Sequence, residues 1–125
     1  MSDPIPASLD HYLAMWNEPD LDALGRHLER SCTADVVFAD PNALTRGHEA
    51  LIAMAVEVKR AIPGAIYRRA SGIDEQHGRH RYLWEIEHQG VVVVQGMDVA
   101  TVDDRGLIER IDGFFTPAPP PLEPR

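Results

Sequence analysis

The feature that most constrains the fold is a run of four strand-like segments that fills the second half of the chain. They lie near residues 65–74, 79–88, 91–102 and 107–116. Turn sequences separate them, at His77-Gly78, Gln89-Gly90 and Asp103-Asp104-Arg105-Gly106. Short turns of this kind join antiparallel neighbours. Because helices do not alternate with these strands, a parallel sheet built from βαβ units is disfavoured.

The first half reads as mainly helical. Apolar residues fall at i, i+3, i+4 and i+7 on one helical face, at Leu9, Tyr12, Leu13 and Trp16. We predict that this helix ends at Asn17-Glu18-Pro19, and that a short second helix begins at Asp20. A strand over 35–39 and a third helix over about 48–61 follow. Helices followed by strands predict an α+β fold, with a curved antiparallel sheet wrapped around three helices.

The chain has 125 residues, enough for one domain. We place a single folded domain at 1–116 and a Pro-rich tail at 117–125, which holds five of the ten prolines. Such a composition predicts an extended, exposed terminus. A strap across a dimer partner is the alternative interpretation of the tail.

Composition narrows the classes of partner. Twelve basic and 20 acidic residues give a formal net charge of −8, which argues against nucleic acid and anionic membranes as partners. Cys32 is the single cysteine, and none of the six histidines shows metal-ligand spacing, so we expect no metal site. The start of the sequence does not resemble a signal peptide, and a cytoplasmic location is the simplest expectation.

Two carboxyl groups stand where a strand should be apolar. Asp98 interrupts the apolar run 91–100, and Asp40 shares one side of its strand with Val36 and Phe38. A buried carboxylate either finds hydrogen-bond donors or takes up a proton. Two such groups in one apolar cavity can act as an acid and a base. The alternative is that Asp40 caps a turn beside Pro41 while Asp98 faces solvent.

Several short segments, taken in order, resemble one superfamily. They are Tyr12…Trp16-Asn17, Asp20-Leu21-Asp22, Val36-Val37-Phe38-Ala39-Asp40-Pro41, Arg46-Gly47-His48-Glu49-Ala50-Leu51 and Gly96-Met97-Asp98-Val99. Over residues 7 to 116 the chain resembles the nuclear transport factor two-like, or SnoaL-like, proteins. The resemblance implies a cone in which a strongly bent sheet closes over three helices around one deep pocket. It also implies a homodimer, formed through the outer face of the sheet.

Within that superfamily the chain is most similar to the ketosteroid isomerase type at Tyr12, Asp40 and Asp98. The resemblance implies that Asp40 is a general base that moves a proton between carbons next to a carbonyl. Tyr12 and a protonated Asp98 would then donate hydrogen bonds to the enolate oxygen. Donors fixed in a dry pocket stabilise such developing charge more than water does. No cofactor or metal is needed for this reaction.

Four further residues are candidates for substrate binding. Trp16 lies one helical turn after Tyr12, Trp84 shares a strand face with Ile86, and the resemblance places Phe115 inside the cone. Two inward-pointing indoles would favour a small substrate. His48 starts the third helix, where it could reach the pocket mouth. By contrast, we interpret Tyr67 with Arg68 and Arg69 as a polar strand face only.

The leading function is therefore binding of a small apolar or carbonyl-bearing molecule, with isomerase or cyclase-type proton transfer. One alternative is a non-catalytic ligand-binding or dimerisation module of the same fold. Another is a hydrolase or dehydratase variant in which Asp98 and His48 act on water.

Overall fold

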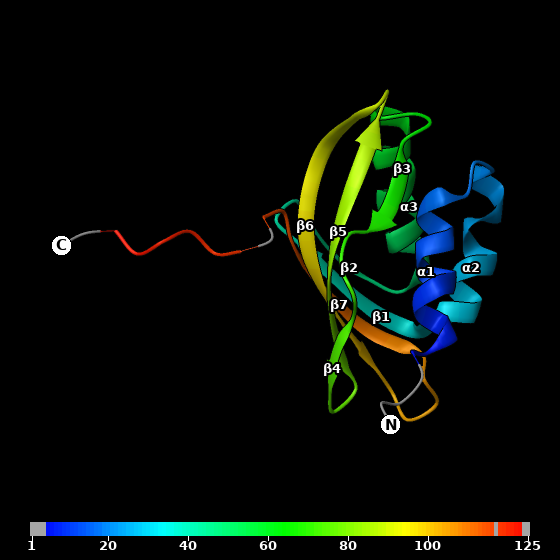
Figure 1. Cartoon of the computed structure of the whole chain (residues 1–125). Helices are drawn as coiled ribbons and strands as arrows, with labels where there is room; N and C mark the ends of the chain where they lie inside the picture. Colours follow the sequence, from blue (N-terminus) through cyan, green and yellow to red (C-terminus); the bar gives the residue numbers. More distant parts are fainter. Residues whose placement is uncertain (1–4, 117, 124–125) are drawn as a thin grey trace.

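The helices of the protein form one layer over one face of a curled sheet (Figure 1). The structure, a computed structural model, describes residues 5–116 and 118–123. The helices are α1 (Ala7–Asn17), a 3₁₀ turn η1 (Leu21–Ala23), α2 (Leu24–Ser31) and α3 (His48–Ala61). The strands are β1 (Cys32–Asp40), β2 (Ala43–Arg46), β3 (Ile66–Arg69), β4 (Asp74–Gln76), β5 (Arg79–His88), β6 (Val91–Val102) and β7 (Ile108–Phe114).

The strands pair in the order β2-β1-β7-β6-β5-β3, with β4 also paired to β5. The α+β class and the sheet curled over helices are confirmed. The sheet differs from a wholly antiparallel one in a single pairing, since β1 runs parallel to β7. No hairpin joins these two strands, so their relative direction is not fixed by a turn. In addition, the segment predicted as one strand at 65–74 is divided between β3 and β4.

Two tight turns set the long antiparallel part of the sheet. His77 and Gly78 both have positive φ, at 47° and 82°, and so do Gln89 and Gly90, at 54° and 82°. Positive φ at both central residues is typical of the type I′ hairpin turn, which matches the twist of the strands it joins. A register shift between Ile86 and Glu87 then leaves an extra residue in β6, and such a bulge bends a strand.

The core lies between the helices and the face of the sheet that they cover. The fully buried large side chains are Leu9 and Met15 of α1, Leu24 and Leu28 of α2, Leu51 of α3, and Val36, Ile108 and Ile111 of the sheet. Burying each of these contributes about 1.5–3 kcal/mol. A cavity also lies between the two layers, lined by residues of α1, α3 and the sheet.

The last described residues, 118–123, lie outside this packed body. Phe114 ends the last strand, and residues 118–123 are exposed and run away from the sheet (Figure 1). Pro117, Pro124 and Arg125, which belong to the predicted tail, lie outside the described residues. No helix in the described ranges is both long and apolar enough to cross a bilayer.

Candidate functional site

Asp98 lies on the inner face of β6, where only 9% of its surface is exposed. The alternation of β6 places Gly96, Asp98 and Ala100 on this buried face. Two side chains of the neighbouring strand donate hydrogen bonds to the carboxylate. Trp84 Nε1 lies 2.9 Å from Oδ1, and the hydroxyl of Tyr82 lies 3.3 Å from Oδ2. The buried carboxylate has therefore found donors, as its position requires.

Its surroundings move the titration of Asp98 toward neutral pH. Burial raises the pKa of Asp98 to about 7, although the hydrogen bonds from Trp84 and Tyr82 oppose this rise. The negative charges of Asp40 and Asp112 add to it. A carboxyl with this pKa exists in both forms near pH 7, so it can both give and accept a proton.

Two glycines make room for this arrangement. Gly96 is opposite Trp84 in the pairing of β5 with β6, and a Cβ there would lie 2.3 Å from the indole ring. Gly113 is opposite Asp98 in the pairing of β6 with β7, and a Cβ there would lie 2.8 Å from Oδ1 of Asp98. Side chains at these positions would displace the indole and the carboxylate.

Asp40 both caps a turn and lines the cavity. Its Oδ1 accepts hydrogen bonds from the backbone N–H groups of Asn42 and Ala43, both at 2.8 Å, and so holds the turn between β1 and β2. It also lines the cavity that Asp98 lines. The Cβ of Asp40 lies 3.6 Å from the Cβ position of a residue at 113, so both acids flank Gly113.

Tyr12 brings a phenol to the same cavity from α1. Its side chain is buried, with 4% of its surface exposed. Burial raises the pKa of Tyr12 well above its ordinary value, and the nearby charge of Asp98 raises it further. The hydroxyl therefore keeps its proton at neutral pH and is available as a hydrogen-bond donor.

The cavity has a volume of about 230 Å³ and mainly apolar walls. Trp16 stacks on Tyr67 with ring centroids 5.1 Å apart, and Trp84 meets Phe115 edge-on at 6.2 Å. Because a cavity of about 150 Å³ binds benzene, this one has room for a six-membered ring with substituents. Its acidic end is formed by Asp40 and Asp98.

Six of the seven candidate residues meet in this cavity: Tyr12, Trp16, Asp40, Trp84, Asp98 and Phe115. His48 is not among the described residues that line it, which corrects the expectation that it reaches the pocket mouth. Its Nε2 lies 2.9 Å from the carbonyl oxygen of Thr33 and 3.3 Å from that of Cys32. The His48 ring thus links the start of α3 to the start of β1, whereas Asp40 is at the other end of that strand.

Sequence reasoning missed two tyrosines. Tyr82 binds Asp98, and Tyr67 is buried in the cavity wall rather than on a polar face. The alternation of Tyr82 with Trp84 and Ile86 along β5 was the signal for the first. In the described part of the chain, no group of three or more His, Cys, Asp or Glu residues is placed to hold a metal ion.

Comparison with known proteins identifies the fold. Neither a protein-family model nor a curated protein matches the sequence. A SnoaL-like family protein from Agrobacterium tumefaciens strain C58, named as an isomerase, superposes with a TM-score of 0.82 at 24% identity. That match covers 88% of this chain and 95% of the other.

Two other solved structures are similar. A Sinorhizobium meliloti protein named as a polyketide cyclase gives a TM-score of 0.69 at 20% identity, covering 86% of this chain and 94% of its own. TerC, crystallised with polyporic acid, gives 0.72 at 16% identity, covering 91% and 92%. The chain therefore has the nuclear transport factor two-like fold of the SnoaL-like proteins.

Proposed function

We propose that the cavity binds a small ring compound that bears a carbonyl, and that Asp40 moves a proton between carbon atoms next to that carbonyl, assisted by Tyr12 and Asp98. The observation that carries this proposal is Asp98, a buried acid with two hydrogen-bond donors and a second acid nearby. Similar folds in proteins named as an isomerase and as a polyketide cyclase also support it.

The proposed reaction needs one base and two hydrogen-bond donors. Because Oδ1 of Asp40 binds two backbone N–H groups, we assign the base to Oδ2. It removes a proton from the carbon next to the carbonyl, and the electron pair of that C–H bond moves to the carbonyl oxygen. Tyr12 and protonated Asp98 donate hydrogen bonds to the resulting enolate. Asp40 then returns the proton to another carbon, so the reaction is an isomerisation with no net change in atoms.

A substrate with a single ring fits the volume of the cavity and tests this proposal. Cyclohex-3-enone becomes conjugated cyclohex-2-enone, which is followed by ultraviolet absorbance. We expect Asp40→Asn to lower kcat by about 10²–10⁴-fold, because the general base is lost. Tyr12→Phe should lower it by about 10²–10³-fold, through loss of a donor to the enolate. His48→Gln is the control and should retain turnover, since His48 lies outside the described cavity lining.

Binding without conversion is the second candidate function, and the turn-holding hydrogen bonds of Asp40 favour it. In that case the cavity binds the ring compound while wild type and Asp40→Asn are equally inactive. Equal turnover by wild type and Asp40→Asn would instead show that another group is the base. The alternative in which His48 acts on water is not favoured, because His48 lies outside the described cavity lining.

A further inference from the structure

Arg69 is one of two arginines, with Arg68, in the mainly apolar wall of the cavity. It follows Tyr67 by two residues on β3, so both side chains lie on the same face of that strand, and both line the cavity. The side chain of Arg69 is 26% exposed. A guanidinium in this position is partly shielded from water and faces the space available to a ligand.

The only hydrogen-bond partner of this guanidinium within the described ranges is weakly held. Arg69 Nη2 lies 2.7 Å from Oδ1 of Asp10, whose side chain is 67% exposed. Exposed ion pairs of this kind contribute little, about 0–1 kcal/mol. Arginine carries five N–H donors, so Nε and Nη1 remain for a ligand after Asp10 has bound Nη2.

The adjacent arginine differs in this respect. Arg68 Nε lies 2.8 Å from Glu85, and its Nη2 lies 2.9 Å from Glu87. Two carboxylates on β5 therefore already neutralise Arg68. Of these two consecutive arginines, Arg69 therefore has the charge and the N–H donors that can bind a ligand.

Arg69 is opposite Trp84 in the pairing of β3 with β5, and Trp84 donates a hydrogen bond to Asp98. The positive charge of Arg69 also opposes the rise in the pKa of Tyr82 that burial and the charge of Asp98 cause. The strand of Arg69 thus lies beside the strand that carries both donors to Asp98. A ring whose carbonyl meets Asp98 can therefore direct a second substituent toward Arg69 without leaving the cavity.

We propose that Arg69 binds a carboxylate of the ligand, so that ring-containing oxo acids or hydroxy acids bind in preference to neutral ketones. The inference rests on the proposed function, because it assumes that the same cavity is the ligand site. The planar fork formed by Nε and Nη2 matches a carboxylate, which would replace Asp10 on Nη2 and bind Nε as well. Release from the exposed Asp10 costs little in exchange.

Two probes that differ only in charge test this proposal by calorimetric titration at pH 7. They are 4-hydroxyphenylacetate and 4-hydroxyphenylacetamide. We expect wild type to bind the carboxylate at least about tenfold more tightly than the amide. Arg69→Gln should abolish that preference while changing amide affinity less than about twofold. Asp10→Asn should raise carboxylate affinity about two- to fivefold, because a competing carboxylate is removed.

Arg81→Gln is the matched control. Arg81 also pairs with an exposed aspartate, Asp74, but it lies outside the described cavity lining, and its loss changes the net charge equally. The preference should survive in this variant. The proposal is overturned if wild type binds neither probe at millimolar concentration or shows no preference. Equal weakening of both probes in Arg69→Gln, or loss of the preference in Arg81→Gln, would also overturn it.

The proposed reaction can fail independently of this inference. Turnover of cyclohex-3-enone involves no carboxylate, whereas the preference between the two probes is measured by binding alone. A carboxylate preference without turnover would remove the isomerase proposal and retain the role of Arg69. Turnover without a carboxylate preference would retain the isomerase proposal and remove the role of Arg69.

Discussion

At the scale of single residues, the protonation of Asp98 depends on its burial and on the hydrogen bonds that its neighbours donate. Trp84 and Tyr82 supply two hydrogen bonds, but desolvation still favours the protonated acid. Its pKa of about 7 makes the site sensitive to pH in the neutral range. The free energy of unfolding should also depend on pH, because the carboxyl binds its proton far more tightly in the folded state.

We therefore expect Asp98 to cost stability as pH rises. An unfolded aspartate titrates near pH 4, so between pH 4 and pH 7 the folded state binds more protons and its stability falls. Asp98→Asn cannot ionise, and it should gain up to about 4 kcal/mol relative to wild type between pH 4 and pH 8. Urea unfolding of both proteins across that range measures the difference. A difference independent of pH would show that Asp98 titrates normally.

The sequence revealed Asp98 and Asp40 because charge in an apolar strand pattern is visible without a structure. It did not reveal Tyr82, since an aromatic residue on a strand fits a packed core equally well. Arg69 was missed for a related reason. Alternation shows that Tyr67 and Arg69 share a face but not which face meets the helices, and that depends on how β3 docks beside β5.

At the scale of elements, hydrogen bonds join the end of α1 to β3 at the edge of the sheet. The side chain of Asn17 donates to the carbonyl of Tyr67 at 2.7 Å and accepts from its N–H at 2.9 Å. Lys59 of α3 donates to the carbonyl oxygens of Trp16 and, at 3.0 Å, Glu18. These contacts satisfy backbone groups at a helix end and a sheet edge, and they fix the wall formed by Trp16 and Tyr67.

Asn17→Ala should therefore destabilise the protein by about 1–3 kcal/mol, since two backbone groups of Tyr67 lose their partner. It should also weaken ligand binding, because Tyr67 lines the cavity. Thermal unfolding and calorimetric titration with 4-hydroxyphenylacetate check the two effects. Gln76→Ala removes an amide from the exposed strand β4 and should change neither quantity. An Asn17→Ala protein as stable as wild type would contradict this account.

Element boundaries were most predictable where local chemistry determines them. The third helix and the long strands at 79–88 and 91–102 have the predicted bounds, and a glycine with positive φ directly precedes each of them, at Gly47, Gly78 and Gly90. The short strand β2 was missed, and β4 was not separated from β3. Three or four residues carry too little periodicity to be recognised, and their pairing depends on the strand already beside them.

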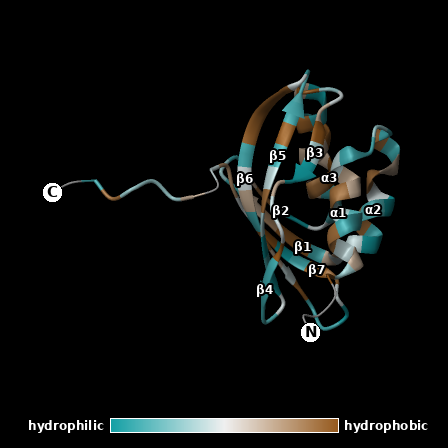
Figure 2. Cartoon of the chain, in the orientation of Figure 1, coloured by the Kyte–Doolittle hydropathy of each residue, from teal (hydrophilic) through white to brown (hydrophobic). Residues whose placement is uncertain are grey.

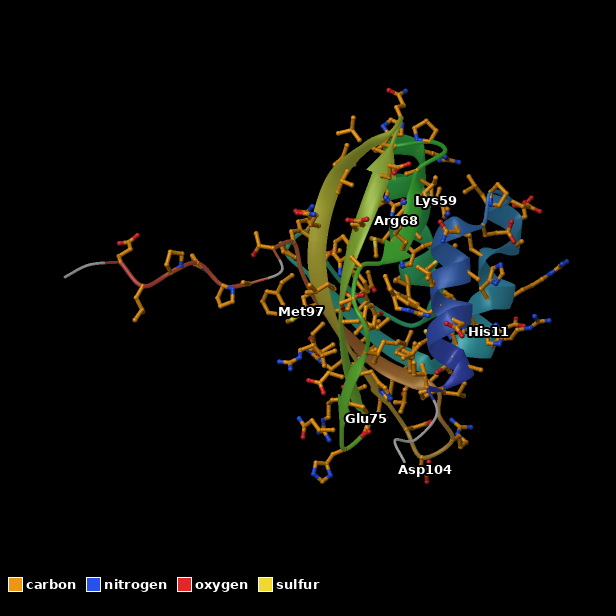
Figure 3. All side chains as sticks on the ribbon, viewed as in Figure 1. His11, Lys59, Arg68, Glu75, Met97 and Asp104 are labelled. Atoms are coloured by element: carbon orange, nitrogen blue, oxygen red, sulfur yellow. The ribbon has the colours of Figure 1, made fainter. Side chains whose placement is uncertain are left out.

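At the scale of the whole molecule, the sheet has a second face that none of the described helices covers (Figure 1). The register places Leu83, Met97 and Phe114 side by side across β5, β6 and β7, and Phe114 is 56% exposed. Met97 lies on the opposite side of the molecule from His11 of α1 (Figure 3). Hydrophobic residues also extend along β6 to its upper end (Figure 2). An apolar row on an uncovered sheet face is a surface that a second molecule can bury.

We propose that two copies of the chain pack through this row, because a two-fold interface places the same apolar patch on both partners. A stable interface of this kind buries about 800 Å² from each partner. We expect the wild type to be a dimer at micromolar concentration by sedimentation equilibrium. Met97→Glu should give monomers, since it would bury two unpaired charges near the symmetry axis. His11→Glu places the same charge on the helical side and should leave the dimer intact. A monomeric wild type would contradict the proposal, as would a Met97→Glu protein that remains dimeric.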